Sequence, residues 1–428
     1  MTEYLKHAPM YSAAVSEQVR ETVSEMLLRI EREGIDAVRA YSRDLDGWDP
    51  ASFRVSPEEI RAAEQGIDDE LRAHIAFAQR QVRTFAEHQR ASLTDIEVQT
   101  LPGVTLGHRH VPIGNVGSYV PGGRYPMLAS AFMTVIVPKV AGVPRVVAMA
   151  PPRRGAGIHP AMLHAMATSG ADEILCLGGV QALAAVTFGI DDIEPVDIIV
   201  GAGNAYVAEA KRQLFGRVGI DLLAGPTEVL VIADESADPE LVAADLLGQA
   251  EHGPTSPAIL ITTSRDFGAA AIDAVDRLLL TWPTAEVAGE AWREHGTVAV
   301  VEDDAAAAAL SDAYAPEHLE IQVDEGRLDW YLDHLRNYGS LFLGEQATVV
   351  YGDKAIGTNH VLPTMGAARY TGGLWVGKFL KTCTWQRLTA EGTAQIAPAA
   401  AAISEAEMLG GHALTATMRL DRIAAGKA

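Results

Sequence analysis

The first hundred residues carry apolar positions at the spacing of an α-helix. Gly34 follows the first such stripe, where a helix would stop, and Ser56-Pro57-Glu58-Glu59 has the form of a capping box that opens another helix. We therefore expect this region to be helical. The apolar stripes consist of Val15, Val19, Val23, Met26, Leu27 and Ile30, and then of Leu71, Ile75, Ala78, Val82 and Phe85.

From about residue 113 the pattern changes to short β-branched runs separated by helical segments. This alternation is typical of parallel sheets with helical crossovers. Such strands could form one large sheet or two smaller ones, and the Gly-rich segments near 114–123 and 201–226 favour two. The last sixty residues return to a helical, Ala-rich pattern. The expected strands are Arg145–Ala150, Glu173–Leu177, Val196–Val200, Glu228–Asp234, Ala258–Thr263 and Thr297–Glu302.

Length and composition are those of a globular protein with two or three domains, since the chain has 428 residues, 48% hydrophobic and 21% charged. The 34 Lys and Arg against 56 Asp and Glu give a formal charge of −22. That balance argues against binding to nucleic acid or to an anionic membrane, which requires a basic face. A small anionic substrate stays possible, because a local pocket can be positive inside an acidic shell.

Two cysteines, Cys176 and Cys383, cannot form a disulfide framework or a cysteine-based zinc site. The N-terminal residues lack the apolar core of a signal peptide, and the longest apolar stretch, 131–143, is interrupted by Pro138 and Lys139. We therefore expect a cytoplasmic protein with no membrane span.

A glycine-rich turn, Gly201-Ala202-Gly203-Asn204, follows an expected strand and precedes an expected helix. A dinucleotide phosphate could bind at such a helix N-terminus. The third glycine position of that fingerprint holds Tyr206, so these glycines could equally serve only a tight turn.

Two further motifs combine residue types that carry chemistry. Gln249 and His252 are three residues apart at the end of an expected helix, where an amide oxygen and an imidazole nitrogen could bind a metal, or the histidine could simply cap the helix. Glu317-His318 could serve two proton transfers on one substrate, or form an exposed polar turn. The loop 357–364, which contains His360, could carry chemistry or merely connect two elements.

Five segments in one order, GNAYVAEAKRQLFG, AGPTEVLVIAD, LLGQAEHGP, APEHLEIQ and GTNHVLPT, together resemble the histidinol dehydrogenase family. The resemblance extends over nearly the whole chain. It implies a homodimeric enzyme that oxidises a primary alcohol to a carboxylate through an aldehyde and reduces two NAD. It also implies one zinc ion in each active site.

The resemblance assigns roles to individual residues. Matching positions make His318 the general base and Glu317 the residue that activates water for attack on the aldehyde. The implied zinc ligands are Gln249, His252 and Asp353 of one chain and His412 of the partner subunit. The implied NAD contacts are Tyr119, Gln181 and Asn204, and the implied substrate contacts are Thr227, His360 and Glu407.

Several positions depart from members that process histidinol, most clearly Trp375 and Lys378. These features look like the paralogous group that includes sulfopropanediol 3-dehydrogenase, whose reaction takes 2,3-dihydroxypropane-1-sulfonate to 3-sulfolactate. We expect Arg124 or Lys378, with Arg369, to bind the sulfonate; Arg124 could instead contact the NAD phosphate or a surface carboxylate. The alternatives are oxidation of L-histidinol, a two-electron reaction that stops at the aldehyde, and a non-catalytic zinc- or nucleotide-binding paralogue.

The expected fold is α/β, with two Rossmann-like doubly wound domains, helical N- and C-terminal extensions and an intertwined homodimer. Residues 1–23 would form the N-terminal extension, and 24–119 plus 226–370 the larger domain. Residues 120–225 would form a smaller inserted domain that contacts NAD, and 371–428 a tail that reaches the partner's active site.

Overall fold

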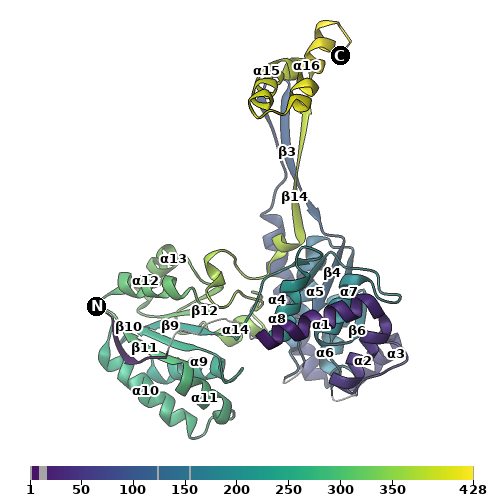
Figure 1. Ribbon diagram of the computed structural model, residues 1–428. Helices are drawn as coiled ribbons and strands as arrows, with labels where there is room; N and C mark the ends of the chain where they lie inside the picture. The colour runs from purple at the N-terminus through teal and green to yellow at the C-terminus, as the bar shows by residue number, and fades with distance from the viewer. Residues whose placement is uncertain (1, 9–16, 123–124, 154–155, 428) are drawn as a thin grey trace.

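The computed structural model describes residues 2–8, 17–122, 125–153 and 156–427, and Arg124 lies outside them. Figure 1 shows two α/β units side by side, with a long antiparallel stalk that rises from them and carries two helices at its tip. The sequence prediction of an α/β fold with two parallel sheets is confirmed. Within the described ranges, no helix combines the length and apolar content needed to cross a membrane.

The first unit contains a five-stranded parallel sheet in the order β6-β5-β4-β7-β8. The chain enters at the central strand β4, moves outward through β5 and β6, and then returns to the other side of β4. This is a doubly wound arrangement with its switch point between β4 and β7. The strands are β4 (Asn115–Tyr119), β5 (Arg145–Ala150), β6 (Glu173–Cys176), β7 (Ile198–Val200) and β8 (Gly219–Ile220), with helices α5 (Leu128–Ala141), α6 (Pro160–Ser169), α7 (Gly179–Phe188) and α8 (Ala205–Leu214).

The N-terminal helices cover this first unit. Helix α1 packs on α7 and α8, α3 packs on α6, and α4 packs on α5. The capping box at Ser56 is present as expected. The expected assignment of 24–119 to the other unit is therefore wrong, because the apolar faces of these helices are buried against the five-stranded sheet and its helices. The helices are α1 (Glu17–Glu33), α2 (Ile35–Asp46), α3 (Pro57–Gln65) and α4 (Asp69–Ala91).

The second unit contains a six-stranded sheet in the order β1-β11-β10-β9-β12-β13, parallel except for β1. Strand β1 (Glu3–Lys6) belongs to this sheet and not to a helical extension, since its backbone pairs with the exposed edge of β11. The remaining strands are β9 (Val229–Ala233), β10 (Ala258–Thr262), β11 (Gly296–Val300), β12 (His318–Gln322) and β13 (Ser340–Leu343). The helices are α9 (Pro239–Ala250), α10 (Arg265–Leu279), α11 (Ala285–His295), α12 (Asp304–Tyr314), α13 (Leu328–His334) and α14 (Val349–Lys354), with the short 3₁₀ turn η1 (Glu325–Arg327).

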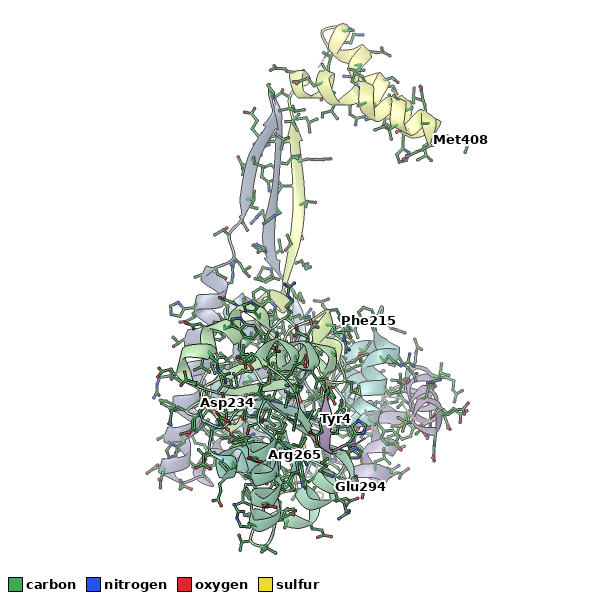
Figure 2. The ribbon with its side chains drawn as sticks, turned by 90° about the vertical axis from the view of Figure 1, so that its left-hand side faces the viewer. Tyr4, Phe215, Asp234, Arg265, Glu294 and Met408 are labelled. Atoms are coloured by element: carbon green, nitrogen blue, oxygen red, sulfur yellow. The ribbon has the colours of Figure 1, made fainter. Side chains whose placement is uncertain are left out.

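The stalk is a three-stranded antiparallel sheet in the order β14-β3-β2. Its tip is a helical hairpin, and Figure 2 shows Met408 on that tip, well apart from the body of the molecule. The C-terminal segment leaves the body only from β14 onward, because Leu374, Val376 and Phe379 before it are buried in the core of the first unit. The elements are β2 (Ile96–Leu101), β3 (Val104–Pro112), β14 (Leu380–Leu388), α15 (Ala390–Ala406) and α16 (Gly410–Ala424), preceded by the turns η2 (Ala367–Arg369) and η3 (Val376–Phe379).

Candidate active site

Glu317 and His318 lie at the start of β12, a central strand of the six-stranded sheet. Both are buried, with 5% and 2% of their surface exposed, so the alternative of an exposed polar turn is wrong. The Glu317 carboxylate accepts hydrogen bonds from Thr227 Oγ1 at 2.5 Å and from the backbone N–H of Glu228 at 3.0 Å. These donors hold the carboxylate beside the imidazole, 3.4 Å from His318 Nδ1.

The ring of His318 is oriented by its neighbours. Nδ1 lies 3.0 Å from the carbonyl oxygen of Glu228, to which an Nδ1–H donates. Nε2 lies 3.4 Å from Asp353 Oδ1 and has no hydrogen-bond partner in the described part of the chain. Burial alone would lower the pKa of His318, but Glu317 and Asp353 outweigh that effect and raise it well above its ordinary value.

Three implied metal ligands lie at this site, and two of them, Gln249 and Asp353, contact the ring. Gln249 is in the last turn of α9, and its Nε2 hydrogen-bonds Thr227 and lies 3.4 Å from His318 Nδ1. His252 lies just beyond the end of that helix, and burial lowers its pKa, which favours the neutral form that binds metals. Burial would raise the pKa of Asp353, but the charges of His318 and its neighbours outweigh that effect and hold it far below its usual range.

The loop 357–364 contributes to the same site. His360 Nε2 is 2.7 Å from Ser130 Oγ on α5, and His360 Nδ1 is 3.1 Å from the carbonyl oxygen of Asp353. Burial lowers the pKa of His360. Because Ser130 belongs to the first unit and His360 to the second, this contact joins the two units at the site. No local pattern pointed to Ser130, because this contact depends on packing between distant segments.

A cavity of about 540 Å³ opens beside these residues. Its wall comes from both units, with Tyr125–Ala129 on one side and α9 and α14 on the other. Gln249, His252 and Asp353 all line it. A small organic substrate therefore has space next to the candidate metal ligands.

A second cavity, of about 710 Å³, lies where β4, β6 and β7 end. It contains all three expected NAD contacts. Gly179 N–H donates to Tyr119 Oη at 3.2 Å, Gln181 Nε2 donates to Asp46 at 2.9 Å, and the Asn204 side chain caps α8. The carboxyl ends of β4 and β7 form the switch point at which doubly wound sheets bind dinucleotides.

Some expected site residues lie elsewhere. Glu407 and His412 are exposed on the tip of the stalk, away from the cavities of their own chain (Figure 1). Lys378 donates to Thr371 Oγ1 at 3.0 Å and does not line either cavity. Arg369 binds backbone carbonyl oxygens of Gly366 and Ala313, so its guanidinium is already engaged.

The side chains at this site are of types that suit zinc. Imidazole, carboxylate and amide oxygen are groups that zinc accepts, and the buried Nε2 of His318 faces Asp353 without a hydrogen-bond partner in the described ranges. Among the described residues, no group of three or more His, Cys, Asp or Glu is arranged so that it could hold a metal ion. The residue types therefore suit zinc, while their arrangement in one chain does not by itself make a metal site.

Comparisons with known proteins agree over almost the whole chain. A family model described as histidinol dehydrogenase matches residues 11–420. A histidinol dehydrogenase homolog from Shouchella clausii is 54% identical over 99% of both chains, and a sulfopropanediol 3-dehydrogenase from Ruegeria pomeroyi is 48% identical over 98% of this chain and 96% of its own. The crystal structure of histidinol dehydrogenase from Elizabethkingia anophelis matches with a TM-score of 0.91 at 35% identity, covering 97% of this chain and 95% of that one.

Proposed function

Because this chain belongs to the histidinol dehydrogenase family and is an oxidoreductase, we propose that it oxidises a primary alcohol to a carboxylate through an aldehyde, with NAD and zinc. One observation carries the proposal. The buried Glu317–His318 pair contacts Gln249 and Asp353, which line the substrate-sized cavity. A non-catalytic binding paralogue has no use for two buried proton acceptors beside that cavity.

Each of the two proton acceptors would serve one of the two oxidations. A hydride leaves carbon only as the hydroxyl proton leaves oxygen, and the neutral form of His318 would take that proton on Nε2, since Nδ1–H donates to the carbonyl oxygen of Glu228. The second oxidation needs a hydrated aldehyde, for which Glu317 would take a proton from water. Zinc, bound by Gln249, His252, Asp353 and the partner's His412, would act as a Lewis acid that polarises the substrate oxygen.

The cofactor would lie in the cavity at the switch point. Tyr119, Gln181 and Asn204 line it, and its volume of about 710 Å³ suits a large ligand. The loop that follows β7 ends at Asn204, the N-cap of α8, where backbone N–H groups favour a phosphate.

A homodimer would complete each site. The tip of the stalk exposes apolar side chains that an isolated chain would leave in water, and Met408 alone is 92% exposed. A second copy that covers this surface would bring His412 and Glu407 of the partner subunit to the incomplete site. The exposed apolar residues of the tip are Ile396, Ile403, Met408, Leu409, Leu414 and Met418.

For the substrate we propose 2,3-dihydroxypropane-1-sulfonate, which would be oxidised to 3-sulfolactate. The relative from Ruegeria pomeroyi that carries the name sulfopropanediol 3-dehydrogenase supports this choice. L-Histidinol is the second candidate, since the family model and the solved structure carry that name.

Steady-state kinetics with both substrates tests the choice. The purified protein with zinc and NAD should show a higher kcat/KM for 2,3-dihydroxypropane-1-sulfonate than for L-histidinol. A His318→Gln variant provides the inactive control, because the proton acceptor is lost. Efficient turnover of L-histidinol without turnover of the sulfonate would refute the proposed substrate.

A further inference from the structure

Lys354, the last residue of α14, lies on the wall of the 540 Å³ cavity. Its Nζ is 3.5 Å from Asp353 Oδ2, while the other oxygen of that carboxylate faces His318. The Lys354 side chain is 47% exposed and is one of those that line the cavity. The positive charge is therefore next to an implied metal ligand.

Among the described residues that line this cavity, Lys354 is the only lysine or arginine. The two other carboxylates of the wall are already engaged. Glu251 accepts a hydrogen bond from Thr284 at 2.6 Å, and Asp245 accepts from Gln322 at 2.8 Å and from Thr348 at 2.9 Å. In contrast, the only polar contact of the Lys354 ammonium within the described ranges is the ion pair with Asp353, and its length leaves N–H donors for a ligand.

Two of the three cations expected from sequence do not provide such a group, and the third, Arg124, lies outside the described residues. Lys378 donates to Thr371 and does not line the cavity, and Arg369 is engaged by backbone carbonyl oxygens. Among the described residues, Lys354 is therefore better placed than Lys378 and Arg369 to bind an anionic substrate.

We propose that Lys354 binds the anionic end of the substrate and thereby selects short hydroxyalkyl anions, an inference that rests on the proposed function. Because Lys354 adjoins Asp353, the anion must lie only a few bonds from the reacting alcohol, as in a three-carbon diol that carries a sulfonate or a carboxylate. The same ammonium group repels a substrate that carries an amine there. The Lys354 ammonium group would donate a charge-assisted hydrogen bond to such an anion.

Three ligands that share a terminal 1,2-diol and differ in the group at the other end separate the effect of charge from the effect of size. They are 2,3-dihydroxypropane-1-sulfonate, its carboxylate analogue 3,4-dihydroxybutanoate, and the neutral butane-1,2-diol. In Lys354→Met the KM of both anions should rise about 10- to 100-fold while kcat is retained, the range expected when one charge-assisted hydrogen bond is lost. The KM or inhibition constant of the neutral diol should not change. A rise for one anion only would show which of the two the site recognises.

Matched variants exclude a general loss of structure. Lys354→Arg keeps the charge and should restore most of the affinity for anions. Lys381→Met, on an exposed position of β14, should behave as the unchanged protein. Zinc content and melting temperature are measured for every variant.

The outcomes separate the inference from the proposed function. If the unchanged protein prefers the anions and the Lys354→Met variant keeps this preference, the role of Lys354 is overturned. The proposed function then stands. An equal loss for all three ligands, or a loss in Lys378→Met instead, also overturns the role of Lys354. An unchanged protein that oxidises L-histidinol and none of the three diols refutes the proposed substrate itself.

Discussion

A buried ion pair holds the loop at the switch point of the first unit. Lys211 on α8 and Asp221 have 2% and 0% of their side chains exposed and form a direct contact. The Lys211 ammonium donates to the carbonyl oxygen of Gly201 at 2.8 Å, and the Asp221 carboxylate accepts from the N–H of Gly201 at 2.7 Å. Both polar backbone groups of Gly201 thus depend on the pair. Gly201 has φ of +113°, a conformation that favours glycine.

Replacing Lys211 by Met keeps the length of the side chain and removes its charge. Asp221 then stays buried with two backbone N–H donors, from Gly201 and Leu222, and no cation. Breaking one side of a buried pair destabilises proteins by about 3–5 kcal/mol, because the remaining charge is uncompensated. We expect a loss of this size, together with weaker NAD binding, since the held loop leads directly to Asn204.

Urea unfolding followed by circular dichroism measures the loss, and calorimetry measures NAD binding. The double variant Lys211→Met/Asp221→Asn removes the orphaned charge and should regain at least about 1 kcal/mol over the single variant, a typical coupling between contacting residues. A single variant that loses less than about 1 kcal/mol, with no gain in the double variant, would refute the reasoning, because a loss that small is the value of an exposed pair.

Three other changes test separate parts of the account. Glu317→Gln should lower kcat by about 10²- to 10⁴-fold with zinc retained, the range for losing a general base, and NADH formation at an unchanged rate would contradict the role. Burial and then Asp245 raise the pKa of Glu320 from 4.5 to about 8, so its contribution to stability is present below pH 4.5 and is lost as the pH rises towards 8. The urea midpoints at pH 6 and pH 9 should therefore differ more in the unchanged protein than in Glu320→Gln. Equal differences in the two proteins would contradict this effect of Glu320. Mixing inactive His412→Ala and Asp353→Ala chains should recover about a quarter of the activity, since half of the dimers regain one of two sites, and no recovery would exclude a shared site.

Local signals in the sequence predicted much of the fold. The Ser56 capping box and six of the parallel strands were predicted to within a few residues, because caps and short β-branched runs are determined by neighbours along the chain. Strands β4, β8, β12 and β13 were not predicted. The placement of α1 to α4 was not predictable in this way. Their periodicity identifies an apolar face, such as Ile75 and Val82 on α4, but not the sheet that covers it.

The residues of the candidate site were also predicted only in part. The grouping of Gln249, His252, Asp353 and His318 was anticipated only through the family resemblance, since Gln249 and Asp353 lie 104 positions apart in the sequence. Ser130 and Lys354 were missed.

 The contact between Ser130 and His360 joins two units and leaves no local pattern, whereas Lys354 had a signal, its position next to the expected ligand Asp353.

The stalk was the hardest part to predict. Strand β2 is exposed at every position, so it lacks the alternation of buried and exposed residues that identifies a strand. Glu407 and His412 are exposed on its tip, and the proposed shared site would place them beside the cavity of a second copy of the chain.

The number of NADH molecules formed per molecule of substrate tests the central claim most directly. The zinc-loaded protein is supplied with excess NAD and a limiting amount of 2,3-dihydroxypropane-1-sulfonate, and NADH absorbance is followed to completion. The account predicts two NADH per molecule and 3-sulfolactate as the product, with activity lost on chelation and restored by zinc. One NADH with accumulating aldehyde, or full activity in the chelated protein, would contradict it.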